Sequence, residues 1–240
     1  MTLKLLVRQF VFACLLGTAV WGTEAAASGL QVSPVSLTLT GNQNAGGLWL
    51  SNQGDNIVNA QVRVYHWSQS NFADTLSSSQ GLVVSPPMLT LAPGARQLIR
   101  IIRVGAPPNN VEDAYRLAID ELPPATLQKN KLEFVLHYSL PVFIQPASNP
   151  PTSVKLQWTL RHIGNSDFLE VNNQGNSHAQ LSAITYISPN GARKVITPGL
   201  LGYVLPGMTM RWILPVSNEY LNRGSKIEVS INGEKTLQDL

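Results

Sequence analysis

Apolar and polar residues alternate along most of the chain, with turn-forming residues between the alternating segments. A period of two is typical of a strand that has one dry face and one wet face. No long segment shows the 3.6-residue period of an amphipathic helix. The clearest segments are VSLTLT (35–40), LWLSNQG (48–54), AQVRVYHW (60–67), LVVSPPMLTLAPG (82–94), QLIRIIRV (97–104) and YRLAIDEL (115–122). With a seventh strand after them, they predict an immunoglobulin-like sandwich of about 100 residues.

The seventh segment, KNKLEFVLHYSLPVFIQPA (129–147), alternates for longer than one strand needs. Every even-numbered position from Leu132 to Ile144 is apolar or aromatic, whereas an ordinary strand has about five or six residues. Pro141 lies within it, and a proline cannot donate to a ladder, so it belongs at a sheet edge or a bulge. The stretch therefore predicts a long edge strand, with which another chain can pair.

The second half of the chain repeats signals of the first half in the same order. In each half, a strand ends in Asn-Gln-Gly, the next begins with Ala-Gln, and a Pro-Gly turn precedes a strand that contains Arg. The matched segments are 50–54 with 171–175, 60–65 with 179–184, and 91–100 with 204–212. Asn-Gly and Pro-Gly turns are also common in general, but three matches in one order favour two domains of one kind.

We therefore expect an all-β protein with two immunoglobulin-like β-sandwich domains, at 28–147 and 148–240. Between them, QPASNPP (145–151) is typical of a short, stiff, Pro-rich linker.

The first 27 residues have the three parts of a secretory signal peptide. Lys4 and Arg8 precede an apolar run, and small residues follow it, which predicts cleavage after Ala27. The apolar run is too short for a membrane span, and no later segment approaches one. Because Cys14 lies in the signal, the mature chain has no cysteine. A packed core must therefore hold it together in an oxidising compartment.

Charge and motifs exclude several function classes. After removal of the signal, 15 basic and 13 acidic residues remain, a net charge of +2, which is too small for a nucleic-acid binder with a clustered basic face. Asp120 and Glu121 are neighbours on a strand and point to opposite faces. There is no Gly-x-Ser-x-Gly elbow and no phosphate-binding glycine loop.

The histidines also lack metal-ligand spacing with another His, Cys or Glu, so each is expected to be a surface or half-buried strand residue. They are His66, His137, His162 and His178. We expect no enzyme activity, cofactor or metal, and look for the function in a surface.

An exposed edge strand can complete the incomplete sheet of another protein. Backbone hydrogen bonds then give affinity, and every second side chain fills a pocket. We favour this role for the first part of the long stretch, because we do not expect a seven-strand sandwich to cover its whole length. The candidate donor side chains are Leu132, Phe134, Leu136 and Tyr138. The later apolar positions, Leu140, Val142 and Ile144, are expected in the domain's own core.

Two such domains, a signal peptide and a long strand before the linker resemble the PapD-like periplasmic pilus chaperones. The segments 84–101 (VSPPMLTLAPGARQLIRI), 112–124 (EDAYRLAIDELPP) and 138–146 (YSLPVFIQP) are similar to the archaic, or sigma-type, chaperone–usher branch. The resemblance is strongest across the first domain. It implies a periplasmic chaperone that stabilises pilus subunits by donor-strand complementation and delivers them to an outer-membrane usher.

The sequence departs from this family where the better-known members anchor a pilin's C-terminal carboxylate. Those proteins usually carry an Arg in the first strand and a Lys in the long strand, whereas this chain has Ser36 and Pro141. Neither residue can bind a carboxylate as a cation. The usual Arg-Pro ending of the long strand is changed as well, to Gln145-Pro146.

Arg116 is the candidate replacement for the carboxylate anchor. Its parity points it out of the sandwich, and its strand should neighbour the donor strand near the cleft between domains. A guanidinium is always charged and grips carboxylates in a bidentate fork. The alternative is a structural ion pair with Glu112 or Asp120, and we expect Arg100 to pair with Glu112.

Two other functions are compatible with the sequence. A pilus subunit or adhesin would use the same strand exchange, with SGLQVSPVSLTL (28–39) as its donor extension; the two-domain repeat and the internal hairpin argue against it. A secreted carbohydrate-binding module would use Trp67, Trp158 or Trp212 as a sugar platform, although each is more simply a core residue. The sequence does not specify the pilin, its pilus or the usher.

Overall fold

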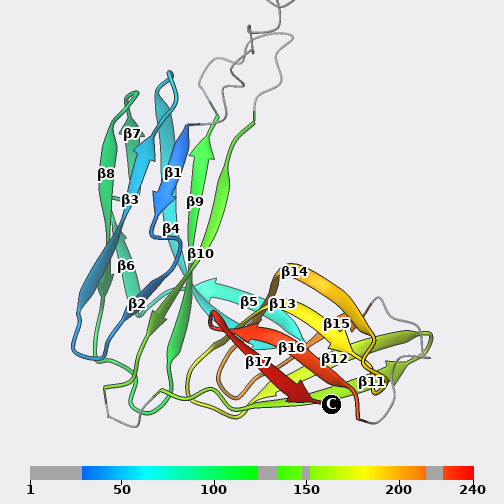
Figure 1. Cartoon of the computed structure of the whole chain (residues 1–240). Coiled ribbons are helices and arrows are strands. Elements are labelled where there is room, and N and C mark those ends of the chain that lie inside the picture. Colours follow the sequence, from blue (N-terminus) through cyan, green and yellow to red (C-terminus); the bar gives the residue numbers. More distant parts are fainter. Residues whose placement is uncertain (1–28, 124–133, 148–151, 215–223) are drawn as a thin grey trace, which may run out of the picture.

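The computed structural model describes residues 29–123, 134–147, 152–214 and 224–240 (Figure 1). In these ranges every regular element is a strand, which confirms the all-β prediction. The strands form four sheets, and no pair of described strands joins one of the first ten to one of the last seven. The expected signal peptide (1–27) and residues 148–151 of the expected linker lie outside the described residues.

The first ten strands form a sandwich of a four-stranded and a six-stranded sheet. In spatial order, the four-stranded sheet contains β1 (Leu30–Ser33), β3 (Ala45–Asn52), β8 (Arg96–Arg103) and β6 (Leu82–Ser85). The six-stranded sheet contains β2 (Leu37–Leu39), β10 (His137–Ile144), β9 (Asp113–Leu122), β4 (Val58–Ser70) and β5 (Ala73–Ser78), with β7 (Met88–Leu91) also paired to β4. Alternate side chains of both sheets, including Leu50, Ile99 and Leu117, are completely buried between them.

The last seven strands form the second sandwich. One sheet contains β11 (Leu156–Ile163), β12 (Ser166–Asn173) and β15 (Thr209–Leu214), and the other contains β14 (Arg193–Val204), β13 (Ala179–Ile187), β16 (Lys226–Ile231) and β17 (Glu234–Asp239). Its core is separate from the first and includes Leu169, Leu181 and Ile227. The fold is therefore two immunoglobulin-like sandwiches in sequence order.

Asn52, at the end of β3, shows why the Asn-Gln-Gly signal recurs. Its side chain is completely buried, donates to the carbonyls of Asn56 and Leu91 at 2.7 and 3.0 Å, and accepts from the amide of Gly54 at 3.0 Å. Asn173, at the end of β12, makes the same three kinds of bond at 2.8, 3.0 and 2.9 Å. Each asparagine therefore satisfies backbone groups that would otherwise be buried without partners.

The Pro-Gly turn closes the same corner in each sandwich. The amide of Gly94 donates to the carbonyl of Asn52 at 2.9 Å, and the amide of Gly207 donates to that of Asn173 at 2.8 Å. Both glycines have a φ of 72°, in the left-handed region that a side chain disfavours. The repeated sequence signals thus specify one corner that occurs twice.

The two sandwiches meet at an angle, which gives the molecule a bent shape (Figure 1). Trp67 of β4, Phe143 of β10 and Tyr203 of β14 form the centre of this contact. The Trp67 ring centroid lies 6.0 Å from that of Phe143 and 5.4 Å from that of Tyr203. The aromatic contact therefore joins the end of β10 to the second sandwich.

An acid–histidine pair lies beside this aromatic contact. Nδ1 of His178 lies 2.7 Å from Oε1 of Glu112, whose side chain is almost completely buried. The His178 ring stacks on Phe143, with centroids 3.5 Å apart. The amide of Glu112 also donates to the carbonyl of Asn176 at 2.9 Å. Both backbone and side chains thus fix how the sandwiches meet.

Candidate functional site

Half of β10 forms an open sheet edge. On one side β10 pairs with β9 along its whole length, from His137 to Ile144. On the other side its only partner in the part of the chain that the structure describes is β2, which pairs in parallel with Val142–Ile144. The first part of β10 is therefore a free edge, as the sequence predicted from Pro141.

The backbone groups of this edge point outward. The amide of Glu121 donates to the carbonyl of Leu136, which faces β9, and the amide of Gln145 donates to a carbonyl of β2. Because successive residues of a strand direct their backbone groups to opposite sides, the residues facing away from β9 have odd numbers. These are His137, Ser139 and Pro141. Pro141 has no N–H, so its place at the edge leaves no donor unpaired.

The side chains of the stretch divide into two groups. Leu140, Val142 and Ile144 are buried in the first core, which confirms their expected role. Of the four candidate donor residues, Leu136 and Tyr138 are partly buried against the same core. The Tyr138 hydroxyl also donates to the carbonyl of Leu30 at 2.7 Å.

Phe134 is the candidate donor that the first sandwich does not cover. Its relative exposure is 76%. The alternation suggested one strand from Leu132 to Ile144, but β10 begins only at His137, because Phe134–Leu136 precede the ladder. Leu132 lies outside the described residues. An exposed phenylalanine immediately before an open edge is a surface that favours a partner.

Charged side chains fix the outer face beside the open edge. Asp120 of β9 lies 2.6 Å from Nη2 of Arg63 and 2.5 Å from Nδ1 of His137. Partial burial by itself favours the neutral carboxyl, but the hydrogen bonds from Arg63 and His137 hold the pKa of Asp120 below its usual value. The pairing orients the first residue of β10.

Arg116 lies in the same row of the sheet as the two positions that lack the family's usual cations. Its Cα partner is Pro141 on one side and Tyr65 on the other. Ser36 directly precedes β2, whose Leu37 pairs with Val142. The three positions compared in the sequence thus lie on neighbouring strands, and Arg116 faces out of the first core as expected.

The guanidinium of Arg116 lies between aromatic rings of both sandwiches. Its central carbon is 3.7 Å from the ring centroid of Trp67 and 5.2 Å from that of Tyr203. Its side chain is only 14% exposed. Burial lowers the pKa of Arg116, and the nearby Asp74 opposes that shift. The closest acidic oxygen, Oδ2 of Asp74, lies 3.9 Å from Nη2.

Within the described residues, the guanidinium of Arg116 has ring contacts and one loose ion pair. To other residues in the described ranges, its side chain makes no hydrogen bond. A guanidinium stacked on a ring keeps its N–H groups in the plane of the fork, where a carboxylate can accept two of them. The site is therefore a half-buried cation at the contact between the sandwiches.

The structural partners expected for Arg116 were wrong. Glu112 binds His178, and Asp120 binds Arg63 and His137. Arg100 is exposed on the four-stranded sheet, and so does not pair with Glu112. The alternation predicts which face of the sheet each side chain occupies. It does not predict which end of the long β4 and β9 strands contacts the second sandwich.

Sequence reasoning missed Trp67 and Gln69 as parts of this site. Both lie on β4 with the parity opposite to that of Val62, a core residue. A large apolar residue such as Trp67 on the otherwise polar face was the available signal of a second contact. Asp74 and Tyr203 carried no such signal, because they come from other elements.

The remaining candidates carry no comparable site. In the described residues, no group of three His, Cys, Asp or Glu is placed to hold a metal, and each histidine instead lies beside one carboxylate. Trp67 is buried, and Trp158 and Trp212 pack against the second core, so none forms an open sugar platform. Nor do these ranges contain a helix of the length and apolar character needed to cross a membrane.

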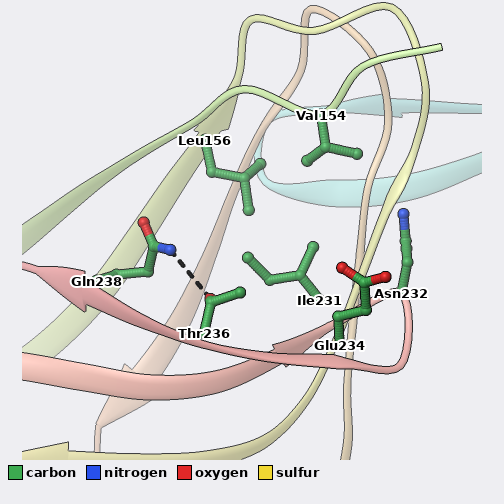
Figure 2. A pocket seen from close by; sticks show the side chains of 7 residues that line it. All are labelled: Val154, Leu156, Ile231, Asn232, Glu234, Thr236 and Gln238. Atoms are coloured by element: carbon green, nitrogen blue, oxygen red, sulfur yellow. Dashed lines mark hydrogen bonds between the residues drawn. The ribbon is translucent and has the colours of Figure 1, made fainter. Parts of the chain in front are cut away.

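A cavity of about 460 Å³ lies in the second sandwich (Figure 2). Leu156 of β11 and Ile231 of β16 point into it from opposite sheets, and Glu234 of β17 is the one ionisable side chain in its lining. Polar groups of β17, joined by the Gln238–Thr236 hydrogen bond of 3.0 Å, form its rim. Four of its seven lining residues are polar or charged, and two of these, Thr236 and Gln238, bond to each other.

Comparison with known proteins identifies the family. Residues 29–150, half of the chain, match the model of the pili and flagellar-assembly chaperone, PapD N-terminal domain. The chain belongs to the PapD family of chaperones. The matched region of this chain includes β10 and Arg116. The family is one of chaperones and not of enzymes.

Individual relatives agree with this assignment. The chain is 26% identical over 134 residues to the chaperone protein PmfD of Proteus mirabilis, a match that covers 55% of this chain and about half, 51%, of that protein.

Solved structures extend the likeness to both sandwiches. A chain of the CsuC–CsuE chaperone–tip adhesion subunit pre-assembly complex, from the archaic chaperone–usher Csu pili of Acinetobacter baumannii, has a TM-score of 0.69 and 26% identity. That match covers 87% of this chain and 96% of the other. A chain of the SafA pilin–SafB chaperone complex of Salmonella enterica has the same fold, with a TM-score of 0.65, 18% identity, and 91% and 99% of the two chains covered.

Proposed function

We propose that this chain is a periplasmic chaperone that binds pilus subunits by lending them part of its edge strand. The observation that carries the proposal is the division of β10. Val142–Ile144 is paired on both sides and buried, whereas His137–Ser139 has a partner on one side only among the described strands, is exposed or partly exposed, and follows the exposed Phe134. The Csu and Saf structures, which hold a chaperone together with a subunit, support this reading.

In this function, an extended segment of the subunit pairs with the outward backbone groups of His137, Ser139 and Pro141. The alternate side chains before and within the open edge enter the subunit's incomplete core. The proposed donor residues are Leu132, Phe134, Leu136 and Tyr138. Of the three that the structure describes, Phe134 has the most apolar surface to gain from burial, because its own sandwich covers least of it.

Arg116 is the proposed anchor for the C-terminal carboxylate of the subunit. It is the largely buried cation in the row of Ser36 and Pro141, and within the described residues its side chain makes no hydrogen bond. A carboxylate buried there needs a charged partner, since an unpaired buried charge costs several kcal/mol. Anchoring one end of the subunit would also fix the register of strand pairing.

The sequence supplies the remaining parts of this function. Cleavage after Ala27 would release a mature protein of two domains, 28–147 and 148–240, into the periplasm. There it would pass the bound subunit to an outer-membrane usher, as the archaic chaperone–usher branch implies.

The test is co-expression with the secreted proteins encoded beside this chain, followed by purification. A pilus subunit should copurify with the wild-type protein and be lost with Phe134→Asp, because the substitution puts a charge into an apolar pocket. Ile213→Asp is the matched control: it changes a residue that is 66% exposed on β15, and should retain the subunit.

Two results would overturn the proposal. Retention of the subunit by Phe134→Asp would exclude the donor role, and unfolding of that variant would place Phe134 in the protein's own core. Size exclusion separates the rival function, since a pilus subunit polymerises whereas a chaperone stays small.

A further inference from the structure

Asp74 of β5 holds an unusual position relative to Arg116. Its Oδ2 lies 3.9 Å from Nη2 of Arg116, which is too far for a hydrogen bond. Its Oδ1 accepts a hydrogen bond of 2.9 Å from Nε2 of Gln69. The carboxylate is therefore near enough to act on the charge of Arg116 but makes none of the short bonds that a guanidinium fork can give.

Gln69 holds Asp74 at that distance. The Gln69 side chain is buried, with 4% exposure. Its Nε2 also donates to the carbonyl of Tyr203 at 2.9 Å, and its Oε1 accepts from the amide of Leu205 at 2.9 Å. Since Tyr203 and Leu205 belong to the second sandwich, the position of Asp74 is set by the contact between the two domains.

We propose that Asp74 is a built-in counter-ion that balances Arg116 in the free protein and competes with the terminal carboxylate of a bound subunit. The inference rests on the proposed function, in which Arg116 is the anchor. A subunit carboxylate that reaches the fork makes two charge-assisted hydrogen bonds, whereas Asp74 makes none. The subunit carboxylate therefore replaces Asp74 as the partner of the Arg116 guanidinium. The negative charge of Asp74 stays nearby, and its repulsion lowers the affinity for the subunit carboxylate.

Competition between Asp74 and the subunit carboxylate would help a chaperone to release its subunit. Because Asp74 lies on an exposed hairpin, with 47% of its side chain accessible, its interaction with Arg116 is screened and modest. It lowers the affinity for a carboxylate without abolishing binding, and it gives Arg116 a counter-charge as the subunit leaves. Asp74 thus sets the affinity of the anchor at a value that permits release.

The test is Asp74→Asn, which removes the charge and keeps an oxygen that can accept from Gln69. The probe is the pilus subunit that copurifies in the experiment above, prepared with a free C-terminus or with a short C-terminal tail. We expect the variant to bind the free C-terminus about two- to fivefold more tightly, and the gain to shrink at high salt. The tailed subunit should show no gain.

Asp239→Asn is the matched control. It makes the same charge change on β17, at a side chain that is 85% exposed and paired with Lys226, and should leave the affinity unchanged. The gain from Asp74→Asn should also vanish when Arg116 is replaced by Ala, because the competition needs both charges.

The outcomes separate this inference from the function beneath it. Unchanged or weaker binding by Asp74→Asn, with Arg116→Ala still harmful, would overturn the counter-ion role and leave the anchor in place. Normal binding by Arg116→Ala would overturn the anchor and this inference together. The donor role of β10 is judged separately, by Phe134→Asp.

Discussion

Arg116→Ala tests the anchor most directly, because its effects on stability and on binding should differ in size. In the free protein the substitution removes a cation–π contact with Trp67 at 3.7 Å, worth about 0.5–2 kcal/mol. It also removes the loose pair with Asp74 at 3.9 Å, worth at most about 1 kcal/mol. Release of a half-buried charge offsets part of this loss. We expect a net destabilisation of about 1 kcal/mol, which lowers the Tm by roughly 2–4 °C.

Binding of a subunit should change much more. The variant loses the hydrogen bonds of a charged donor to the subunit's carboxylate, worth about 1.5–3 kcal/mol. Since each 1.4 kcal/mol is a factor of about ten, Kd should rise by roughly 10- to 150-fold. Arg100→Ala is the control, because it removes an exposed arginine from β8 of the other, four-stranded sheet and should affect binding little.

A double-mutant cycle isolates the interaction. Titration calorimetry of wild type and Arg116→Ala, each with a subunit whose C-terminus is free or blocked, gives the coupling between the two groups. Blocking the carboxylate should weaken binding to the wild type and matter little to the variant. A coupling near zero would assign Arg116 to the domain contact alone and leave the carboxylate without an identified partner.

Two further predictions concern export and folding. Intact mass of the exported protein should show Ser28 as the first residue, and retention of 1–27 would contradict the assigned signal. Asn52→Ala should lower the free energy of unfolding by about 1–3 kcal/mol, because it removes three hydrogen bonds of a completely buried side chain and leaves the carbonyl of the buried Leu91 without that partner. Urea denaturation measures this loss, and a change below about 1 kcal/mol would mean that water replaces the amide.

Period-two alternation predicted the clearest strands of the first sandwich but not its ten-strand total: β5, which is exposed at every position, has no buried face to produce the pattern. Leu140, Val142 and Ile144 lie in the first core as expected, because burial of one strand face is a local property that parity alone determines. The repeated Asn-Gln-Gly and Pro-Gly signals likewise indicated two related domains, since each encodes a local corner. Pro141 correctly indicated an edge, because its missing N–H limits where it can lie.

The partners of charged side chains could not be predicted in the same way. Glu112 lies four residues before Arg116 in the sequence, yet it binds His178 across the domain contact. Asp74 reaches Arg116 from a different hairpin, and Gln69 holds it there. Such contacts depend on how the two sandwiches pack against each other. The alternation of apolar and polar residues carries no information about that packing.

The length of β10 likewise differs from the length that the sequence pattern predicted. The apolar parity continues unbroken from Leu132, but the ladder with β9 begins at His137. Alternation reports which side chains seek an apolar environment, not whether that environment belongs to the same molecule. Phe134 follows the pattern and is still 76% exposed, and parity alone does not distinguish this exposed position from the buried ones after it.

The pairing of β10 also determines how it resists force. Ladder hydrogen bonds run across the strands, so a pull along β10 loads its pairs with β9 and β2 together, in shear. The far end is fixed further by the stack of Phe143 on His178. A pull outward at the Phe134 end instead strains one pair at a time. In the proposed function, a subunit strand bound at this edge would therefore peel away stepwise from its end beside Phe134, while its end near Arg116 still holds.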